Sequence, residues 1–223
     1  MLLAGQGRLY RFKTRFMIRE MDHIPLRRSC YFLTLQTVDW VDIFVRPVHK
    51  QVAVHTLNYF IADKGWKIYA WCLMTNQLHL LICPGATPLA EAEKEYKNFT
   101  TQKILEAINT EQPSRRDWML QRFQSLGTRL KLHKKYHVWQ SQSTPLLIDL
   151  NDTETLLEKF YFIHNHPVRD RIVDTAVEYK YSSARDYNGM KGLVNTTTLP
   201  AIEKELVRAD NAAGTFLVKY VRN

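Results

Sequence analysis

Gln77 and His79 are the residues of this 223-residue chain whose types and spacing first suggest chemistry. They lie in MTNQLHLLI, an apolar segment typical of a strand. Side chains alternate between faces along a strand, so Gln77 and His79 share one face while Leu78 and Leu80 point to the other, into the core. An amide oxygen and an imidazole nitrogen on one rigid face can hold a divalent ion against a phosphate. The competing interpretation is a hydrogen-bonded structural histidine.

The segments around this pair predict the elements that would position it. A β-rich segment at 29–38 precedes a helix that Pro47 begins and Gly65 ends. Two strands follow, WKIYAWCLM and QLHLLICPG, joined as a hairpin. A second helix starts after Pro88 and carries glutamates early and lysines later, as the helix dipole favours. The predicted order is strand, helix, strand, strand, helix.

The second half of the chain predicts an insertion, a short strand and a third helix. Residues 110–138 are polar and basic with interleaved aromatic side chains, which we interpret as an insertion over a nucleic-acid-binding face. A strand is expected at 145–150, and a polar residue at 151–153 caps the helix that follows. Pro167 is expected to end that helix, because its ring clashes with the preceding turn.

The composition limits the class of protein. Hydrophobic residues make up 45% and aromatic residues 12% of the chain, so it can bury the core of one domain with extensions. The formal charge of +9 favours a polyanionic partner, since Lys and Arg side chains release counterions when they neutralise phosphates. The 3 cysteines show no disulfide or zinc spacing, which suits a reducing cytoplasm, and no apolar run approaches the length of a membrane span.

Residues 1–28 are rich in Arg and Lys and precede the first predicted strand. They are interpreted either as a basic arm that follows a phosphate backbone or as an extension, since Met17 and Met21 could each start a shorter chain. The predicted organisation is therefore a basic amino-terminal arm at 1–28, one folded domain at 29–195 and a carboxyl-terminal extension at 196–223.

Several segments resemble one family. MTNQLHLLI is similar to the Met-Pro-Asn-His-hydrophobic-His-hydrophobic segment of the HUH single-tyrosine transposases, specifically the REP-associated tyrosine transposases. YFLTLQTVDWVDIF resembles their first strand, EYKNFTTQKI their Lys-x-Phe-Thr-Ser helix, and FIHNHPVRDRIVD their Tyr-Ile-x-x-Asn-Pro-Val-Arg segment, which YKYSSARDYNGMKGLV follows. The resemblance covers residues 29–195 with the motifs in the same order, and it implies that this segment is a transposase-like single-strand DNA-binding domain. It implies an α+β fold, a ferredoxin-like antiparallel sheet with helices on one face, plus the basic insertion and the carboxyl-terminal extension.

The resemblance also implies an activity and its requirements. In that family a divalent ion, Mg²⁺ or Mn²⁺, polarises the scissile phosphate while a tyrosine hydroxyl attacks it, and the DNA is cleaved and rejoined through a phosphotyrosine. The implied partner is single-stranded or hairpin DNA, in the cytoplasm and without a membrane. The resemblance leaves a homodimer and a monomer open.

This chain departs from the family pattern at the positions that carry the chemistry. Aligned through Pro167, the nucleophile position is Phe162, which has no hydroxyl. The first histidine of the strand pair is replaced by Gln77, and the helix ligand is His166. Gln77, His79 and His166 together still offer two imidazoles and one amide, which motivates the hypothesis of a rearranged metal site.

Tyr161 is the alternative nucleophile. Shifting the alignment by one residue pairs Tyr161 with Asn165, at i and i+4 on one helix face. Adjacent helical residues point about 100° apart, so this register needs a π-bulge or a rotation of the helix. The competing interpretation is an aromatic side chain on the flank of the helix.

Basic and aromatic residues are predicted to contact the nucleic acid. The phosphate track and the base-stacking positions comprise Lys97, Lys103, Arg129, Lys131, Lys134, Lys135, Tyr136 and Trp139. Arg169 is expected either to contact phosphate or to cap the end of its helix, and the alternative for the whole set is an unbound charged surface. Three functions stay open: a metal-dependent DNA strand transferase, an inactive or domesticated module that binds hairpin DNA, and an RNA-binding protein.

Overall fold

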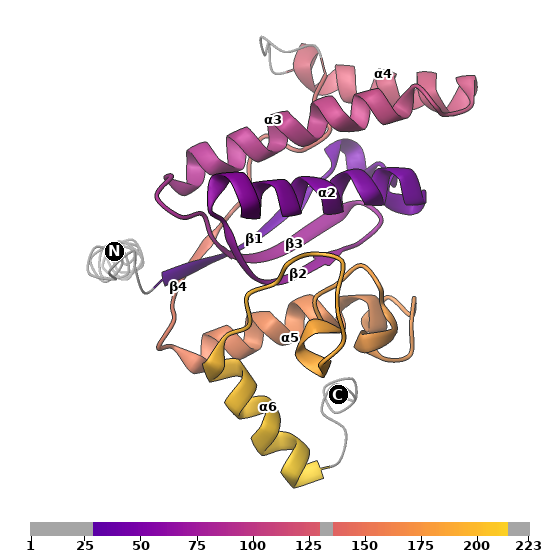
Figure 1. Ribbon diagram of the computed structural model, residues 1–223. Coiled ribbons are helices and arrows are strands. Elements are labelled where there is room, and N and C mark those ends of the chain that lie inside the picture. Colours follow the sequence, from indigo (N-terminus) through magenta and orange to yellow (C-terminus); the bar gives the residue numbers. More distant parts are fainter. Residues whose placement is uncertain (1–28, 130–135, 214–223) are drawn as a thin grey trace, which may run out of the picture.

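The computed structural model of the chain describes residues 29–129 and 136–213, with side chains described at 29–124 and 136–206. The predicted basic arm at 1–28 lies outside the described residues. Figure 1 shows how the described elements are arranged. In chain order they are β1 (Ser29–Gln36), η2 (Val38–Trp40), η3 (Ile43–Val45), α2 (Pro47–Lys64), β2 (Lys67–Leu73), β3 (Gln77–Cys83), α3 (Leu89–Ile108), α4 (Pro113–Arg129), β4 (Leu146–Asp149), α5 (Thr153–Arg169), η4 (Ala176–Glu178), η5 (Asp186–Asn188) and α6 (Pro200–Ala213).

Four strands form one antiparallel sheet in the order β2-β3-β1-β4. β1 and β3 occupy its centre, where Leu33 pairs with Leu80 and Thr34 with His79. With α2 between β1 and β2, and α3 and α4 between β3 and β4, the chain follows the path of a ferredoxin-like fold. The prediction of a ferredoxin-like α+β fold is confirmed.

One face of the sheet packs against α2 and α3. Alternate residues of the central strands point to this face, among them Leu33, Leu78 and Leu80, because side chains alternate along a strand. They belong to the same apolar cluster as Phe60 of α2 and Tyr96 of α3, whose rings meet edge to face with centroids 5.3 Å apart. This cluster holds the central strands in place.

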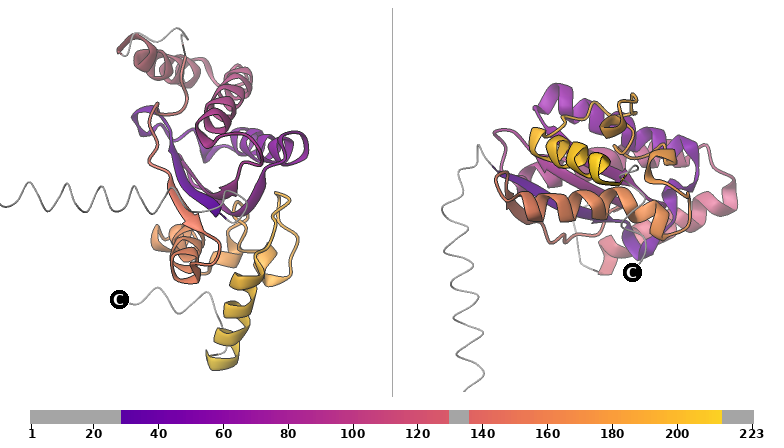
Figure 2. Two further views of the ribbon diagram at one scale, coloured as in Figure 1. Left: turned by 90° about the vertical axis from the view of Figure 1, so that its left-hand side faces the viewer. Right: turned by 90° about the horizontal axis from the view of Figure 1, so that it is seen from below.

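The other face of the sheet is covered by α5, and α6 packs against α5 (Figures 1 and 2). In this detail the structure differs from the prediction, which placed helices on one face. The strands are apolar on both faces, and Cys72 and Leu81 bury the second face against Phe160 and Ile163 of α5. Ile202 of α6 is buried in the same cluster. A sheet with two apolar faces needs a layer on each side, so α5 lies against β2 and β3.

The ends of the helices follow local signals. Pro47 stands in the first turn of α2, and Gly65 ends that helix with a left-handed φ of 69°, which glycine adopts without strain. The Asp152 side chain accepts a backbone N–H hydrogen bond in the first turn of α5. The prediction that Pro167 ends α5 is wrong by two residues. The proline removes only its own N–H, and later amides still donate into the last turn, so the helix continues to Arg169.

The predicted insertion at 110–138 contains a helix, α4, that contributes to the core. Its Met119 and Phe123 side chains are buried in the cluster with α2 and α3. The Val138 carbonyl accepts a hydrogen bond from the Val38 N–H at 2.9 Å, which ties the end of the insertion to the end of β1. A nucleic-acid role for the insertion stays a prediction, as do the domain boundaries. Among the described helices, none is long and apolar enough to cross a membrane.

Candidate metal site and nucleic-acid interface

His79 and His166 meet between β3 and α5. β3 directs His79 to the face that α5 covers, and the last turn of α5 carries His166. The two imidazole rings have centroids 4.7 Å apart and are inclined by 30°. His79 is buried, whereas His166 is partly exposed. The structure therefore brings together two of the three predicted metal-binding residues.

Each imidazole has one nitrogen with a partner and one without. His79 Nδ1 lies 2.8 Å from Thr34 Oγ1, on the neighbouring strand β1. His166 Nε2 lies 3.4 Å from a carboxylate oxygen of Asp170. His79 Nε2 and His166 Nδ1 are buried and have no hydrogen-bond partner among the described residues. Buried polar atoms are normally satisfied, so these two nitrogens mark a place where a ligand could bind.

The surroundings of both histidines favour the neutral imidazole. Burial, with smaller effects from the nearby His166 and Arg169, lowers the pKa of His79 to about 3. Burial also lowers the pKa of His166, while Asp170 opposes this shift and Arg169 adds to it. A neutral imidazole has a lone pair that can bind a metal ion.

Gln77 lies on the same strand face, two residues before His79. Its side-chain N–H donates to Gln36 Oε1 at 2.6 Å, and the Gln36 amide in turn donates to the Asn76 carbonyl. Because the amide nitrogen of Gln77 makes this hydrogen bond, its amide oxygen, Oε1, is the atom that could bind an ion. Within residues 29–124 and 136–206, no three His, Cys, Asp or Glu side chains are grouped to hold a metal ion. The donors that fit an ion are therefore two imidazole nitrogens, with the Gln77 oxygen as a candidate third ligand.

Phe162 occupies the predicted nucleophile position beside the two histidines. Its ring meets those of His79 and His166 edge to face, with centroids 5.3 and 5.8 Å apart. Phe32 of β1 packs against it at 5.6 Å, and the Arg169 guanidinium carbon lies 4.6 Å from the ring centroid. The side chain at the centre of the site is apolar and has no atom that can attack a phosphate.

Tyr161 projects from a different side of α5 than Phe162, since adjacent helical residues point about 100° apart. Its ring packs with Phe160 in the cluster of the second sheet face, with centroids 5.5 Å apart. Asn165 is buried, and its Oδ1 atom has no hydrogen-bond partner in the described part of the chain. α5 is a regular α-helix over Thr153–Arg169, without the π-bulge that the alternative register requires.

Three residues complete the site and were not predicted. Thr34 and Gln36 alternate with the buried leucines of β1, but only the pairing of β1 with β3 shows that they face His79 and Gln77. Asp170 follows His166 by four residues, a spacing that places two side chains together on a helix and could have been noticed. No local pattern identifies Thr34 and Gln36 as site residues, because strand register depends on residues far apart in the chain.

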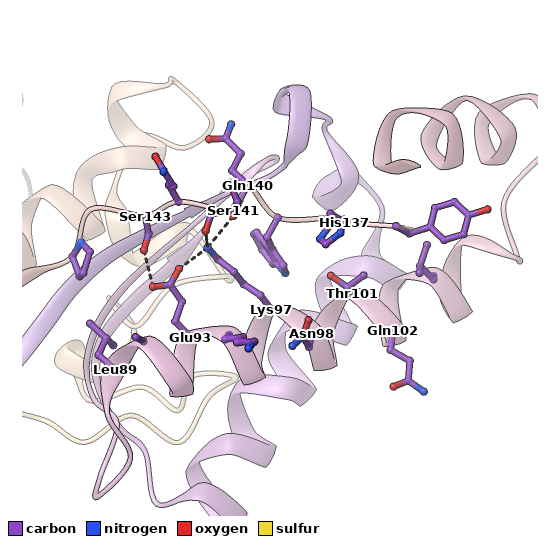
Figure 3. A pocket seen from close by; sticks show the side chains of 17 residues that line it. Leu89, Glu93, Lys97, Asn98, Thr101, Gln102, His137, Gln140, Ser141 and Ser143 are labelled. Atoms are coloured by element: carbon purple, nitrogen blue, oxygen red, sulfur yellow. Dashed lines mark hydrogen bonds and ion pairs between the residues drawn. The ribbon is translucent and has the colours of Figure 1, made fainter. Parts of the chain in front are cut away.

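Lys97 is bound within the fold. Its Nζ donates to the Gln140 carbonyl at 2.9 Å and to the Ser141 carbonyl at 3.4 Å, and it forms an ion pair with Glu93 (Figure 3). Glu93 also accepts a hydrogen bond from the Ser143 hydroxyl at 2.7 Å. The Lys97 side chain is only 14% exposed, so it fastens the segment before β4 to α3. The predicted phosphate contact by Lys97 does not fit this geometry.

Trp139 is a core residue, which corrects its predicted role in base stacking. It is 2% exposed, its Nε1–H donates to Thr100 Oγ1 at 2.7 Å, and its ring stacks on Phe44 with centroids 5.5 Å apart. A base cannot stack on a ring that is enclosed in this way. Tyr136, by contrast, is partly buried and lines an open groove of about 1160 Å³ between α3 and residues 136–145 (Figure 3).

The other predicted DNA contacts divide into described and undescribed side chains. Lys103 is exposed and pairs with Glu106 at 2.9 Å. Arg169 is exposed at the end of α5, where its guanidinium lies against the Phe162 ring. The remaining positions lie outside the described side chains: Arg129, Lys131, Lys134 and Lys135.

One solved structure supports the fold. No protein-family model and no curated protein matches the chain. A solved structure of a REP-associated tyrosine transposase bound to a REP hairpin matches with a TM-score of 0.51 at 14% sequence identity, over 78% of this chain and 90% of that one. A Deinococcus radiodurans R1 protein assigned as a transposase matches with a TM-score of 0.37 at 15% identity, over 58% of this chain and 85% of that one. This chain has the fold of the HUH tyrosine transposases.

Proposed function

We propose that this chain is a transposase-family protein that binds single-stranded or hairpin DNA. The observation that carries the proposal is the fold shared with a transposase bound to a REP hairpin, over 78% of this chain. The formal charge of +9 supports a polyanionic partner. The proposed contacts are Tyr136 for base stacking and, for phosphates, Lys103, Arg129, Lys131, Lys134, Lys135 and Arg169.

The proposed cofactor is a divalent ion held by His79 and His166, with Gln77 as a third ligand. Mg²⁺ and Mn²⁺ are the ions that the sequence resemblance implies. The support from the geometry is the pair of buried imidazole nitrogens that have no hydrogen-bond partner within the described residues. When bound, such an ion draws charge from a phosphate oxygen and orients the strand. Arg169 lies beside these rings and is proposed to contact the same phosphate.

Phe162 is the reason that we propose DNA binding without DNA cleavage. Its ring stands beside both histidines and offers no hydroxyl for a phosphotyrosine. A module that binds hairpin DNA without cleaving it therefore fits the site better than a strand transferase does. Strand transfer through Tyr161 is the second candidate function, and one observation favours it: Asn165, four residues later, has a buried Oδ1 atom without a hydrogen-bond partner in the described chain.

Fluorescence anisotropy with the full chain and a labelled DNA hairpin that carries an unpaired flank tests the binding proposal. We expect the hairpin to bind more tightly than a blunt duplex of equal length, with an affinity that falls linearly with salt on logarithmic axes. Arg169→Gln should reduce the slope of log affinity against log salt concentration by about 1, because one phosphate contact is lost. Arg171→Gln is the matched control, since Arg171 is exposed and has the same charge.

Two results would contradict the proposal. One is the absence of salt-dependent binding to the hairpin. The other is equal affinity for the hairpin and the blunt duplex, which would indicate attraction by net charge alone. An RNA hairpin of the same sequence completes the experiment, because tighter binding to RNA would favour the RNA-binding alternative. The homodimer and the monomer both stay predictions, and sedimentation of the complex distinguishes them.

A further inference from the structure

We propose that the site formed by His79 and His166 selects a transition-metal ion that prefers imidazole ligands over Mg²⁺, and that Thr34 and Asp170 orient the two rings. The inference deepens the metal-binding part of the proposed function and rests on it. The four ring nitrogens carry it, because each imidazole has one nitrogen with a partner and one buried nitrogen without a hydrogen-bond partner in the described part of the chain.

The Thr34 hydroxyl determines which nitrogen of His79 faces the site. A neutral imidazole has one N–H and one lone pair. His79 Nδ1 lies 2.8 Å from Thr34 Oγ1, while Nε2 is buried and lacks a partner within the described chain. A proton on Nε2 would be a buried donor without an acceptor, which is costly. The proton therefore belongs on Nδ1, which donates to Thr34, and the Nε2 lone pair faces the site.

The second ring has the same arrangement with the nitrogens exchanged. His166 Nε2 lies 3.4 Å from Asp170 Oδ2, within ion-pair distance, and we place the proton on Nε2 because the carboxylate attracts it. Nδ1 carries the lone pair, and it is buried without a partner in the residues that the structure describes. Metal-binding histidines usually donate their other N–H to an oxygen acceptor, which fixes the tautomer and the ring orientation. Thr34 and Asp170 provide these two acceptors.

The separation of the two rings fits one shared ion. Imidazole nitrogens bind such ions at about 2.1 Å, so two rings whose bonds to the ion meet near a right angle have centroids about 4.6 Å apart. The observed separation between His79 and His166 is 4.7 Å. The two rings are thus spaced as adjacent ligands of one ion.

The donor atoms determine the class of ion. Imidazole nitrogen suits Ni²⁺, Cu²⁺ and Zn²⁺, whereas Mg²⁺ prefers oxygen ligands and releases its water reluctantly. Asp170 brings one negative charge to His166, and Arg169 brings one positive charge to both rings. The Gln77 oxygen would add a neutral ligand. A site without net charge that offers two nitrogens favours Ni²⁺ or Zn²⁺ over Mn²⁺, and Mn²⁺ over Mg²⁺.

Isothermal titration calorimetry of the full chain without DNA tests the selectivity, with NiCl₂, MnCl₂ and MgCl₂ at pH 7.5. We expect one Ni²⁺ site with an affinity roughly 100-fold or more above that for Mg²⁺. His79→Ala should remove this site. His55→Ala is the matched control and should leave it unchanged, because His55 is exposed on α2. Equal or tighter binding of Mg²⁺, or a Ni²⁺ affinity that His79→Ala leaves intact, would overturn the proposal.

Substitutions around the rings test the orienting residues. Thr34→Val keeps the shape of the side chain and removes the acceptor, so Ni²⁺ affinity should fall about 10- to 100-fold, and Thr34→Ser should restore it. Asp170→Asn should weaken Ni²⁺ binding, whereas Arg169→Gln should strengthen it, because a positive charge beside the ion is lost. Opposite effects at neighbouring positions cannot result from general unfolding.

The outcomes separate this inference from the proposed function. A chain that binds hairpin DNA but no ion overturns the inference and leaves DNA binding intact. A chain that binds Mg²⁺ as tightly as Ni²⁺ keeps the metal site and loses the selectivity. Unchanged Ni²⁺ affinity in both Thr34→Val and Asp170→Asn would overturn the orienting roles, provided that thermal unfolding without metal shows both variants folded.

Discussion

Replacing Trp139 with phenylalanine should destabilise the fold and leave DNA affinity unchanged. The indole Nε1–H donates to Thr100 Oγ1 in the core, and the ring stacks on Phe44. Loss of a buried hydrogen bond costs about 0.5–1.5 kcal/mol. The smaller ring leaves a cavity, which adds about 1–2 kcal/mol. The free energy of unfolding should therefore fall by about 1.5–3.5 kcal/mol.

Urea unfolding followed by circular dichroism measures this change. Thr100→Val removes the acceptor of the same hydrogen bond and leaves the Trp139 N–H unpaired, which should cost about 1–3 kcal/mol. Because both substitutions remove one shared bond, the double variant should be about 1 kcal/mol more stable than the sum of the single effects predicts. Trp118→Phe, at an exposed tryptophan of α4, is the control and should change the free energy of unfolding by less than about 0.5 kcal/mol.

Two results would refute the assignment of Trp139 to the core. The first is an unchanged free energy of unfolding in Trp139→Phe together with weaker hairpin binding, which would restore its role in base stacking. The second concerns the pair: strictly additive effects of the Trp139 and Thr100 substitutions would show that their hydrogen bond does not carry the loss.

Three further predictions concern other parts of the molecule. Lys97→Gln should lower the free energy of unfolding by about 1–3 kcal/mol, because it breaks a largely buried ion pair with Glu93. Lys103→Gln breaks an exposed ion pair and should change the free energy of unfolding by less than about 1 kcal/mol. Equal losses of stability in Lys97→Gln and Lys103→Gln would contradict this reasoning. Burial lowers the pKa of His164 to about 3, so below about pH 6.5 the unfolded chain binds a proton that the folded chain does not, and stability should fall as the pH falls. Urea unfolding at pH 7, 6 and 5 measures this loss of stability. The loss should be smaller in His164→Gln than in the unsubstituted chain, by up to about 1.4 kcal/mol per pH unit, and an equal loss in both proteins would refute the prediction. Phe162→Tyr places a hydroxyl beside the two histidines and should form a metal-dependent covalent adduct with single-stranded DNA; tight binding without an adduct would show that the site is not arranged for attack.

Local sequence signals were sufficient for the four strands, for α2, α3 and α5, and for the direction of one key side chain, but they did not reveal α4 or α6. Pro47 and Gly65 bound α2 because each restricts or permits a particular backbone conformation, whatever the rest of the chain does. The alternation around His79 predicted that it faces away from Leu78 and Leu80, and it does. Pro167 misled the prediction by two residues, because a proline in the last turn removes a single hydrogen bond.

Long-range contacts explain what the sequence could not reveal. Lys97 binds a carbonyl 43 residues away, and Trp139 donates to a hydroxyl 39 residues away. A lysine and a tryptophan suit a nucleic-acid surface and a packed fold equally well, so residue type alone does not distinguish the two roles. The partner of His79 on β1 is likewise visible only through strand register. Buried polar atoms without partners, which define the candidate metal site, are a property of the folded chain alone.

DNA binding without covalent attachment is the central claim, and one gel experiment tests it most directly. The full chain is incubated with a labelled DNA hairpin that carries an unpaired flank, in the presence of Mn²⁺ or Ni²⁺, and each sample is run on a native and on a denaturing gel. We predict a retarded complex on the native gel and free DNA on the denaturing gel. A denaturation-resistant adduct that disappears in Tyr161→Phe would contradict the claim, because it would mean that Tyr161 attacks the strand, and the absence of a native complex would contradict DNA binding itself.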